Sequence, residues 1–237
     1  MTAHGAATAL TKPTAMQSES VGLTTLQQVL LGCGVFSALF YAAMNVVVPL
    51  QWEGYSLAAR VVSELSAIDA PTRPMWVALG VVYAVLAIAF GCGVWATARG
   101  NRPMRVVGSL IVVNTVLGFL WPPMHQREVL AAGGGTLTDT LHIVWTVAWG
   151  VLVLLTIGFA AAAFGRRFRI YSIATVVILL AFGVLTSMDS PQMEANLPTP
   201  LIGVWERINI GVYMLWIGVL AVAILRRPSI AAQRSIP

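Results

Sequence analysis

Charged residues are scarce in this chain. Only 10% of its 237 residues are Asp, Glu, Lys or Arg, whereas 58% are hydrophobic, and the mean hydropathy is +0.82. A soluble domain of this composition could not cover its apolar surface with polar side chains, which excludes that class. Cysteine is also scarce, and two residues cannot build the disulfide framework of a small secreted domain. We therefore expect a protein that uses the membrane as its solvent.

Long apolar runs, by contrast, are abundant. A helix needs about 20 mostly apolar residues to span a membrane, and six runs approach this length: about 26–48, 75–97, 105–121, 139–164, 170–188 and 207–225. We predict an all-α membrane protein with six transmembrane helices in one domain, residues 25–227. A disordered cytoplasmic tail, 1–24, precedes this domain and a second cytoplasmic tail, 228–237, follows it.

The basic residues are sorted by side of the predicted membrane. Ten of the fourteen fall in the connections and tails of one side: Lys12, Arg99, Arg102, Arg105, Arg166, Arg167, Arg169, Arg226, Arg227 and Arg234. By the positive-inside rule this side is the cytoplasm, so we predict a multi-pass protein of the cytoplasmic (cell) membrane with both termini inside. Topology accounts for the net charge of +5 without a nucleic-acid partner, and the expected partner is membrane lipid.

The acidic residues collect on the opposite, outer side. Eight of the nine lie there: Glu53, Glu64, Asp69, Glu128, Asp139, Asp189, Glu194 and Glu206. Because acids contribute little to topology, their placement asks for another explanation. One of them lies in the stretch VVSELSAIDAP, within a segment from Tyr55 to Ile68 whose apolar residues recur at about 100° per residue. We predict a short amphipathic helix in this first outer loop, with Glu64 on its polar face and within reach of Arg60.

The stretch GGGTLTDTLHIVW contains an acid and a histidine three residues apart. Asp139 stands in the predicted first turn of the fourth span, and His142 follows on the same face. The pair could be a general-base pair, metal ligands or a proton relay, or else a capping acid and an interfacial histidine. His125, after the Trp-Pro-Pro that ends the third span, could bring a second imidazole nearby. No HExxH or similar spacing joins these residues, so we predict no metal site, and any cofactor is left open.

Further polar residues stand at or inside the span ends. Asp189 closes the fifth span, and Glu206 and Arg207 open the sixth, where such residues are either anchors and local ion pairs or parts of a site. Asn45 and Asn114 lie deeper, where amides more often form interhelical hydrogen bonds than bind a substrate. Seven ionisable residues fall near one membrane level, which favours a shared, outward-facing polar pocket: Glu64, His125, Asp139, His142, Asp189, Glu206 and Arg207.

Three functions fit this pattern. The first is a protein that binds, or helps to move, a small molecule or a lipid headgroup in that pocket. The second is an intramembrane lipid hydrolase or transferase, with His142 as base oriented by Asp139, and Ser63 or a water as nucleophile. Arg207 would then stabilise the developing anion. The third is a structural membrane protein whose outer face docks a partner. No GxSxG, P-loop or dinucleotide motif chooses between them.

Several of these motifs together resemble a known family. GYS, SELSA followed by AP, Trp-Pro-Pro after the third span, Asp139 with His142, and GVWER before the sixth span are similar to the prokaryotic polytopic membrane family called domain of unknown function 998. The resemblance covers about residues 26–226. It implies a six-helix integral membrane protein and assigns it no activity.

Overall fold

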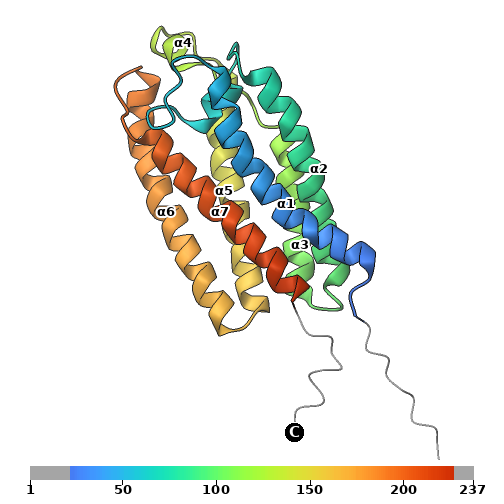
Figure 1. The fold of residues 1–237 in the computed structure, drawn as a ribbon. Helices are drawn as coiled ribbons and strands as arrows, with labels where there is room; N and C mark the ends of the chain where they lie inside the picture. The colour runs from blue at the N-terminus through green and yellow to red at the C-terminus, as the bar shows by residue number, and fades with distance from the viewer. Residues whose placement is uncertain (1–21, 227–237) are drawn as a thin grey trace, which may run out of the picture.

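The computed structural model describes residues 22–226, and within this range the chain is helical with no strand. The long helices are α1 (Thr25–Val47), α2 (Arg73–Thr97), α3 (Arg102–Phe119), α5 (Leu137–Ala163), α6 (Arg166–Glu194) and α7 (Ile202–Leu225) (Figure 1). Three short helices lie between them: the 3₁₀ helices η1 (Pro49–Gln51) and η2 (Val62–Ser66), and α4 (Arg127–Ala131). The predicted all-α class is confirmed. Of the two predicted tails, residues 1–21 and 228–237 lie outside the described residues.

Polar residues fix where several helices begin. Thr24 and Gln27 form a capping box at α1, and Thr136 and Asp139 form one at α5. The side chain of Asn101 caps α3 by accepting from the amide of Met104. These side chains satisfy amides that have no partner inside the helix, which is why each apolar run starts at a defined residue.

Five helices are long and apolar enough to cross a membrane: α1 extended through η1 (Thr25–Gln51), α2, α5, α6 and α7. The helix α3 is not among them. It has only 18 residues. Arg102 and Arg105 in its first turn and the buried Asn114 further along lower its mean hydropathy. A membrane protein with several spans is therefore supported, whereas α3 as a further span, which would make six, stays a prediction.

The six long helices form a closed ring. Each packs on its neighbours in the order α1, α2, α3, α5, α6 and α7, and α7 returns to α1. A core of apolar side chains fills the ring, with Leu31, Phe90 and Trp216 fully buried. The α2–α3 contact is close because a Cβ at Gly108 would lie 2.7 Å from the carbonyl oxygen of Gly91, as expected where small residues let helix backbones approach.

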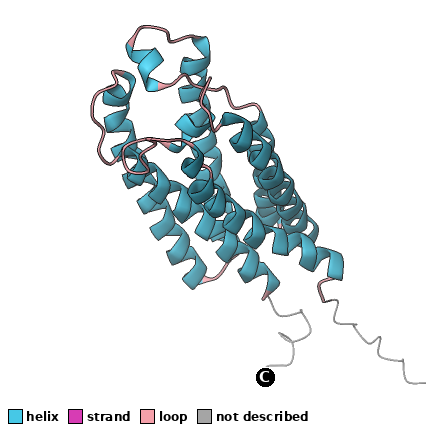
Figure 2. Ribbon diagram, turned by 45° about the horizontal axis from the view of Figure 1, so that its top comes forward, coloured by secondary structure: helices cyan, strands magenta, loops and turns pink. Residues whose placement is uncertain are grey.

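The two ends of the bundle differ. The connections 48–72, 120–136 and 195–201 gather over one end, which we call the loop end (Figure 2). The short connections 98–101 and 164–165 lie at the other end, together with residues 22 and 226; we call this the terminal end. The long, varied connections and most of the acidic residues therefore share the loop end.

The amphipathic helix predicted from Tyr55 to Ile68 does not form. A turn occupies residues 57–59 and a bend residue 60, and only Val62–Ser66 is helical, as the 3₁₀ helix η2. Glu64, expected on a polar face, is fully buried. The reason is that side chains from other elements take the backbone groups an α-helix would use: Arg207 and Glu206 bond to the carbonyl and amide groups of this segment.

Candidate functional site

Glu64 is the centre of an ion-pair network at the loop end. Its carboxylate accepts two hydrogen bonds from Arg127, from Nε and Nη2, both at 2.8 Å. It also accepts from Nη1 of Arg60 at 3.0 Å and from the amide of Val61 at 2.9 Å. Arg127 is itself only 6% exposed. A buried carboxylate with paired charges and several donors is held rigidly, because losing any partner leaves a charge unpaired.

The two arginines tie Glu64 to further elements. Arg127 Nη1 donates to the hydroxyl of Thr199 at 3.1 Å, in the connection before α7. Arg60 also pairs with Glu128 of α4. Burial acts to raise the pKa of Glu128, but hydrogen bonds from its own backbone and from Arg60 outweigh it and hold that pKa below its ordinary value. The network therefore joins the first connection to α4 and to the approach of α7.

The first turns of α7 hold the segment 55–62. The carboxylate of Glu206 accepts from the amide of Val62. Arg207 donates to the carbonyl oxygens of Leu57, at 2.7 Å, and Arg60, at 3.1 Å, and Nη2 bonds to the hydroxyl of Tyr55 at 2.9 Å. Burial raises the pKa of Tyr55 above its ordinary value, although the neighbouring Arg207 acts to lower it. Glu206 and Arg207 thus act on the backbone of the first connection.

A second polar group surrounds the start of α5. Asp139 accepts from the amide of His125 at 2.7 Å, and its other oxygen lies 2.9 Å from His125 Nδ1. His142 is buried, and its Nδ1 lies 2.7 Å from the carbonyl oxygen of Pro122 and 3.0 Å from Nε1 of Trp121. Within residues 22–226, Asp139 and His142 make no hydrogen bond to each other. The acid therefore orients His125, and both histidines fix the segment 121–125.

The predicted site residues consequently separate into two groups. Glu64, Glu206 and Arg207 surround the segment 55–64, and His125, Asp139 and His142 surround the segment 121–125. A backbone hydrogen bond from the amide of Ile68, just after the first segment, to the carbonyl oxygen of Met124 at 2.8 Å joins the first connection to the segment 121–125. Ser63 and Asp189 are half-buried, and in the described part of the chain neither side chain forms a hydrogen bond.

Four side chains of the network were not predicted as site residues: Arg60, Arg127, Glu128 and Thr199. Arg127 and Thr199 complete the surroundings of Glu64, yet lie 63 and 135 positions from it. The sequence gives one indication of such pairing: on the predicted outer side, few basic residues stand among many acidic ones. In the described range, no three His, Cys, Asp or Glu side chains come together as a group that could hold a metal ion.

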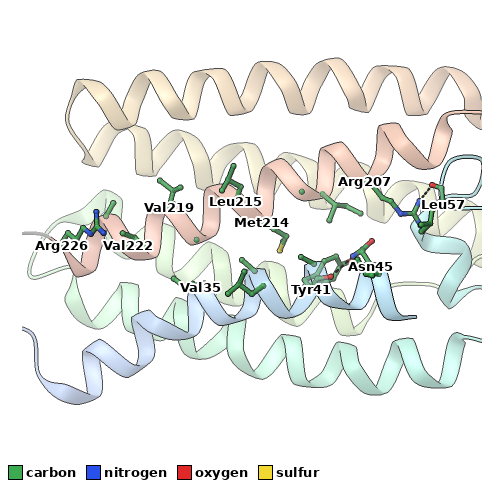
Figure 3. Close-up of a pocket in the computed structure, with 18 residues that line it drawn as sticks. Val35, Tyr41, Asn45, Leu57, Arg207, Met214, Leu215, Val219, Val222 and Arg226 are labelled. Carbon is green, nitrogen blue, oxygen red and sulfur yellow. Dashed lines mark hydrogen bonds between the residues drawn. The ribbon is translucent and has the colours of Figure 1, made fainter. Parts of the chain in front are cut away.

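A groove of about 860 Å³ runs along the outside of the bundle between α1 and α7. Its walls are apolar, and small residues such as Ala38, Ala42, Gly211 and Gly218 make room for it. Figure 3 shows Arg207 near one end of the groove and Arg226 at the other. These arginines stand 19 positions apart on α7, which is about 28 Å at 1.5 Å per residue. The groove is therefore nearly as long as a hydrocarbon core of about 30 Å is thick.

The charged side chains that line this groove are basic. Of the residues that the structure describes, no acidic one lines the groove, while Arg207 and Arg226 do. Among the described residues Arg207 forms no ion pair with a carboxylate; its Nη atoms donate to carbonyl oxygens and to Tyr55, and its Nε has no partner. Asn45 stands on the facing helix at the same end, with Nδ2 bonded to the carbonyl of Tyr41 one turn earlier in α1. Within residues 22–226, Asn45 therefore forms no hydrogen bond to another helix.

Comparison with known proteins adds one relationship. A family model described as "Protein of unknown function (DUF998)" matches residues 35–223, which is most of the chain and most of the helical bundle. No curated protein and no solved structure gives a significant match. The matched range includes all of α2, α3, α5 and α6, the greater part of α1 and α7, the SELSA segment around Glu64 and the WER segment of α7. The chain belongs to the DUF998 family.

Proposed function

We propose that this protein binds an anionic membrane lipid, with the lipid chain in the α1–α7 groove and the headgroup at the loop end beside Arg207. The observation that carries the proposal is the groove itself, which is apolar along its length and has an arginine at each end but no acid. A free polar metabolite would find few partners on such walls. A lipid chain in the bilayer reaches the groove without leaving its own solvent.

The polar groups of the loop end support this binding role indirectly. Glu64, Arg60 and Arg127 are occupied with one another, and they hold the segment whose carbonyl oxygens position Arg207. Among the described residues the guanidinium donates only to neutral groups, so an anion in the groove would be its first charged hydrogen-bond partner. The ion-pair network thus presents one cation at the mouth of an apolar groove.

We also propose how the protein lies in the membrane. We propose residues 25–227 as one transmembrane domain in which α3 also crosses the membrane, which gives six spans, because α3 packs between α2 and α5 in the ring. The loop end then faces outward from the cytoplasmic membrane, and both termini are cytoplasmic, as the arginines of the terminal end favour. The headgroup subsite therefore belongs to the outer leaflet.

A substitution that fills the groove tests the binding role. Gly211 lines the groove, and no atom lies within 4 Å of a Cβ placed there, so Gly211→Leu should fold and occupy the space of the chain. Gly158→Leu is the matched control, because Gly158 is also an exposed helical glycine with no atom within 4 Å, but it lies on α5. Each protein is purified in mild detergent, and bound lipid is extracted and quantified.

We expect wild type and Gly158→Leu to retain anionic lipid, and Gly211→Leu to lose most of it. Unfolding temperatures and size-exclusion profiles establish that all three proteins are folded. Equal amounts of anionic lipid in the three folded proteins would rule out the α1–α7 groove as the binding site.

A further inference from the structure

Two side-chain atoms at the loop end of the groove lack hydrogen-bond partners. Among the described residues four buried side-chain atoms are in this position: Asn45 Oδ1, Asn114 Oδ1, Tyr171 OH and Arg207 Nε. Both Asn45 and Arg207 line the groove, on helices that face each other across it (Figure 3). Buried polar atoms nearly always have a partner, so a pair of unpartnered atoms at one place needs an explanation.

The two atoms differ in what they require. Arg207 Nε carries a proton and needs an acceptor, while Nη1 and Nη2 are already engaged with the first connection. Asn45 Oδ1 is an acceptor and needs a donor, while Nδ2 is already bonded to the carbonyl of Tyr41. Because Nδ2 is held by Tyr41, Oδ1 is the atom of this amide that is left for a donor from a ligand. One acceptor and one donor on the same ligand would satisfy both atoms.

We infer that the loop end of the groove is a headgroup subsite for an anionic lipid that also carries a free hydroxyl, with a phosphate oxygen on Arg207 Nε and the hydroxyl on Asn45 Oδ1. This inference rests on the proposed lipid-binding function and names its ligand class. An ammonium group could also donate to Asn45, but it would then lie beside the positive charge of Arg207. A neutral hydroxyl satisfies Oδ1 without this repulsion.

Two lipids of equal charge and chain length test the hydroxyl. Phosphatidylglycerol carries hydroxyls on its headgroup, whereas phosphatidylmethanol has the same single negative charge and none. Binding of each to the full-length protein is measured by native mass spectrometry after titration in detergent, with phosphatidylcholine as the zwitterionic reference. We expect wild type to bind phosphatidylglycerol about fivefold more tightly than phosphatidylmethanol, the effect of one ordinary hydrogen bond.

Two variants test whether Asn45 causes the preference for phosphatidylglycerol. Asn45→Leu keeps the size of the side chain and removes Oδ1, so it should bind both anionic lipids equally. Leu215→Ala is the control, because Leu215 also lines the groove but is apolar; it should weaken both lipids alike and keep the fivefold preference. Equal binding of the two lipids by wild type would overturn the hydroxyl subsite and leave lipid binding intact.

Two other outcomes are equally decisive. A preference that persists in Asn45→Leu would show that Asn45 does not read the hydroxyl, which overturns this inference alone. Failure of wild type to bind either anionic lipid more tightly than phosphatidylcholine would instead remove the proposed function on which the inference depends.

Discussion

At the scale of single residues, the structure gives Glu64 the largest role in holding the loop end. It is fully buried and receives three hydrogen bonds from two arginines. Replacing Glu64 by Gln removes the negative charge, which leaves buried Arg127 without a carboxylate partner among the described residues and leaves Arg60 with Glu128 alone. Breaking a buried pair in this way costs roughly 3–5 kcal/mol. We expect a large fall in the thermal unfolding midpoint of Glu64→Gln in detergent.

Glu128 provides the matched comparison, because it pairs with the same Arg60 while its side chain is 47% exposed. Exposed pairs contribute about 0–1 kcal/mol, so Glu128→Gln should shift the midpoint only slightly. If the two variants lost the same stability, the pairing with buried Arg127 would not be what holds Glu64.

The sequence indicated the first of these contacts but not the others. Arg60 and Glu64 are four residues apart, and the predicted pair is present at 3.0 Å although the segment is not an α-helix. Arg127 comes from a distant connection, and no local spacing encodes that meeting. Asp139 was expected to face His142, three residues on. Its carboxylate instead turns back to cap the amide of Thr136 and reaches His125, which lies before the helix.

At the scale of elements, the start of α7 is shaped to receive the first connection. A Cβ on Gly203 would overlap the carbonyl oxygens of Arg60 and Leu57, and the amide of Gly203 donates to Ala58 at 2.8 Å. Gly203→Ala should therefore displace the segment and destabilise the protein by roughly 1–3 kcal/mol. The change in unfolding midpoint measures this effect.

Gly211→Ala on the same helix is the control for helix propensity. Its Cβ meets no atom within 4 Å, and replacing glycine by alanine in a helix stabilises by about 0.4–1 kcal/mol. The two substitutions should thus change the midpoint in opposite directions. A shift of the same sign and size in both would mean that the carbonyl contacts of Gly203 do not constrain α7.

The long elements were the most predictable part of the fold. Each of the six apolar runs corresponds to one long helix, and the ends of the helix differ from those of the run by at most six residues. An apolar run indicates that a helix is present, whereas the capping residues decide where the helix begins and ends. The segment 55–68 has the period of a helix, yet tertiary hydrogen bonds from Arg207 and Glu206 replace helical ones. The α1–α7 groove could not be predicted, because it depends on which two helices meet and on small residues facing the same way.

At the scale of the whole molecule, the ring requires that α3 run through the bundle with the other helices. Single cysteines on either side of α3 test this in a background with Cys33 and Cys92 replaced by alanine. Ala132→Cys lies at the loop end and Arg102→Cys at the terminal end, and both positions are exposed. In intact cells a membrane-impermeant maleimide should label Ala132→Cys, and should label Arg102→Cys only after permeabilisation.

Glu53→Cys and Arg166→Cys serve as references for the two ends, since both are exposed and flank helices that meet the criteria for spans. Labelling of Ala132→Cys and Arg102→Cys on the same side would show that α3 does not cross the membrane. Labelling of the terminal end in intact cells would reverse the proposed orientation.

The closure of the ring by α7 against α1 also sets an order of events during synthesis. About 155 residues separate the end of α1 from the start of α7, so at ~5–20 residues per second the ribosome needs roughly 8–30 s to supply the second wall of the groove. Once α2 has been made, α1 has α2 as its neighbour but still lacks α7, and Glu64 lacks the anchors that α7 gives its segment. A nascent chain stopped before Ile202 is therefore an open arc of helices, in which the side of α1 that later faces α7 has no protein neighbour.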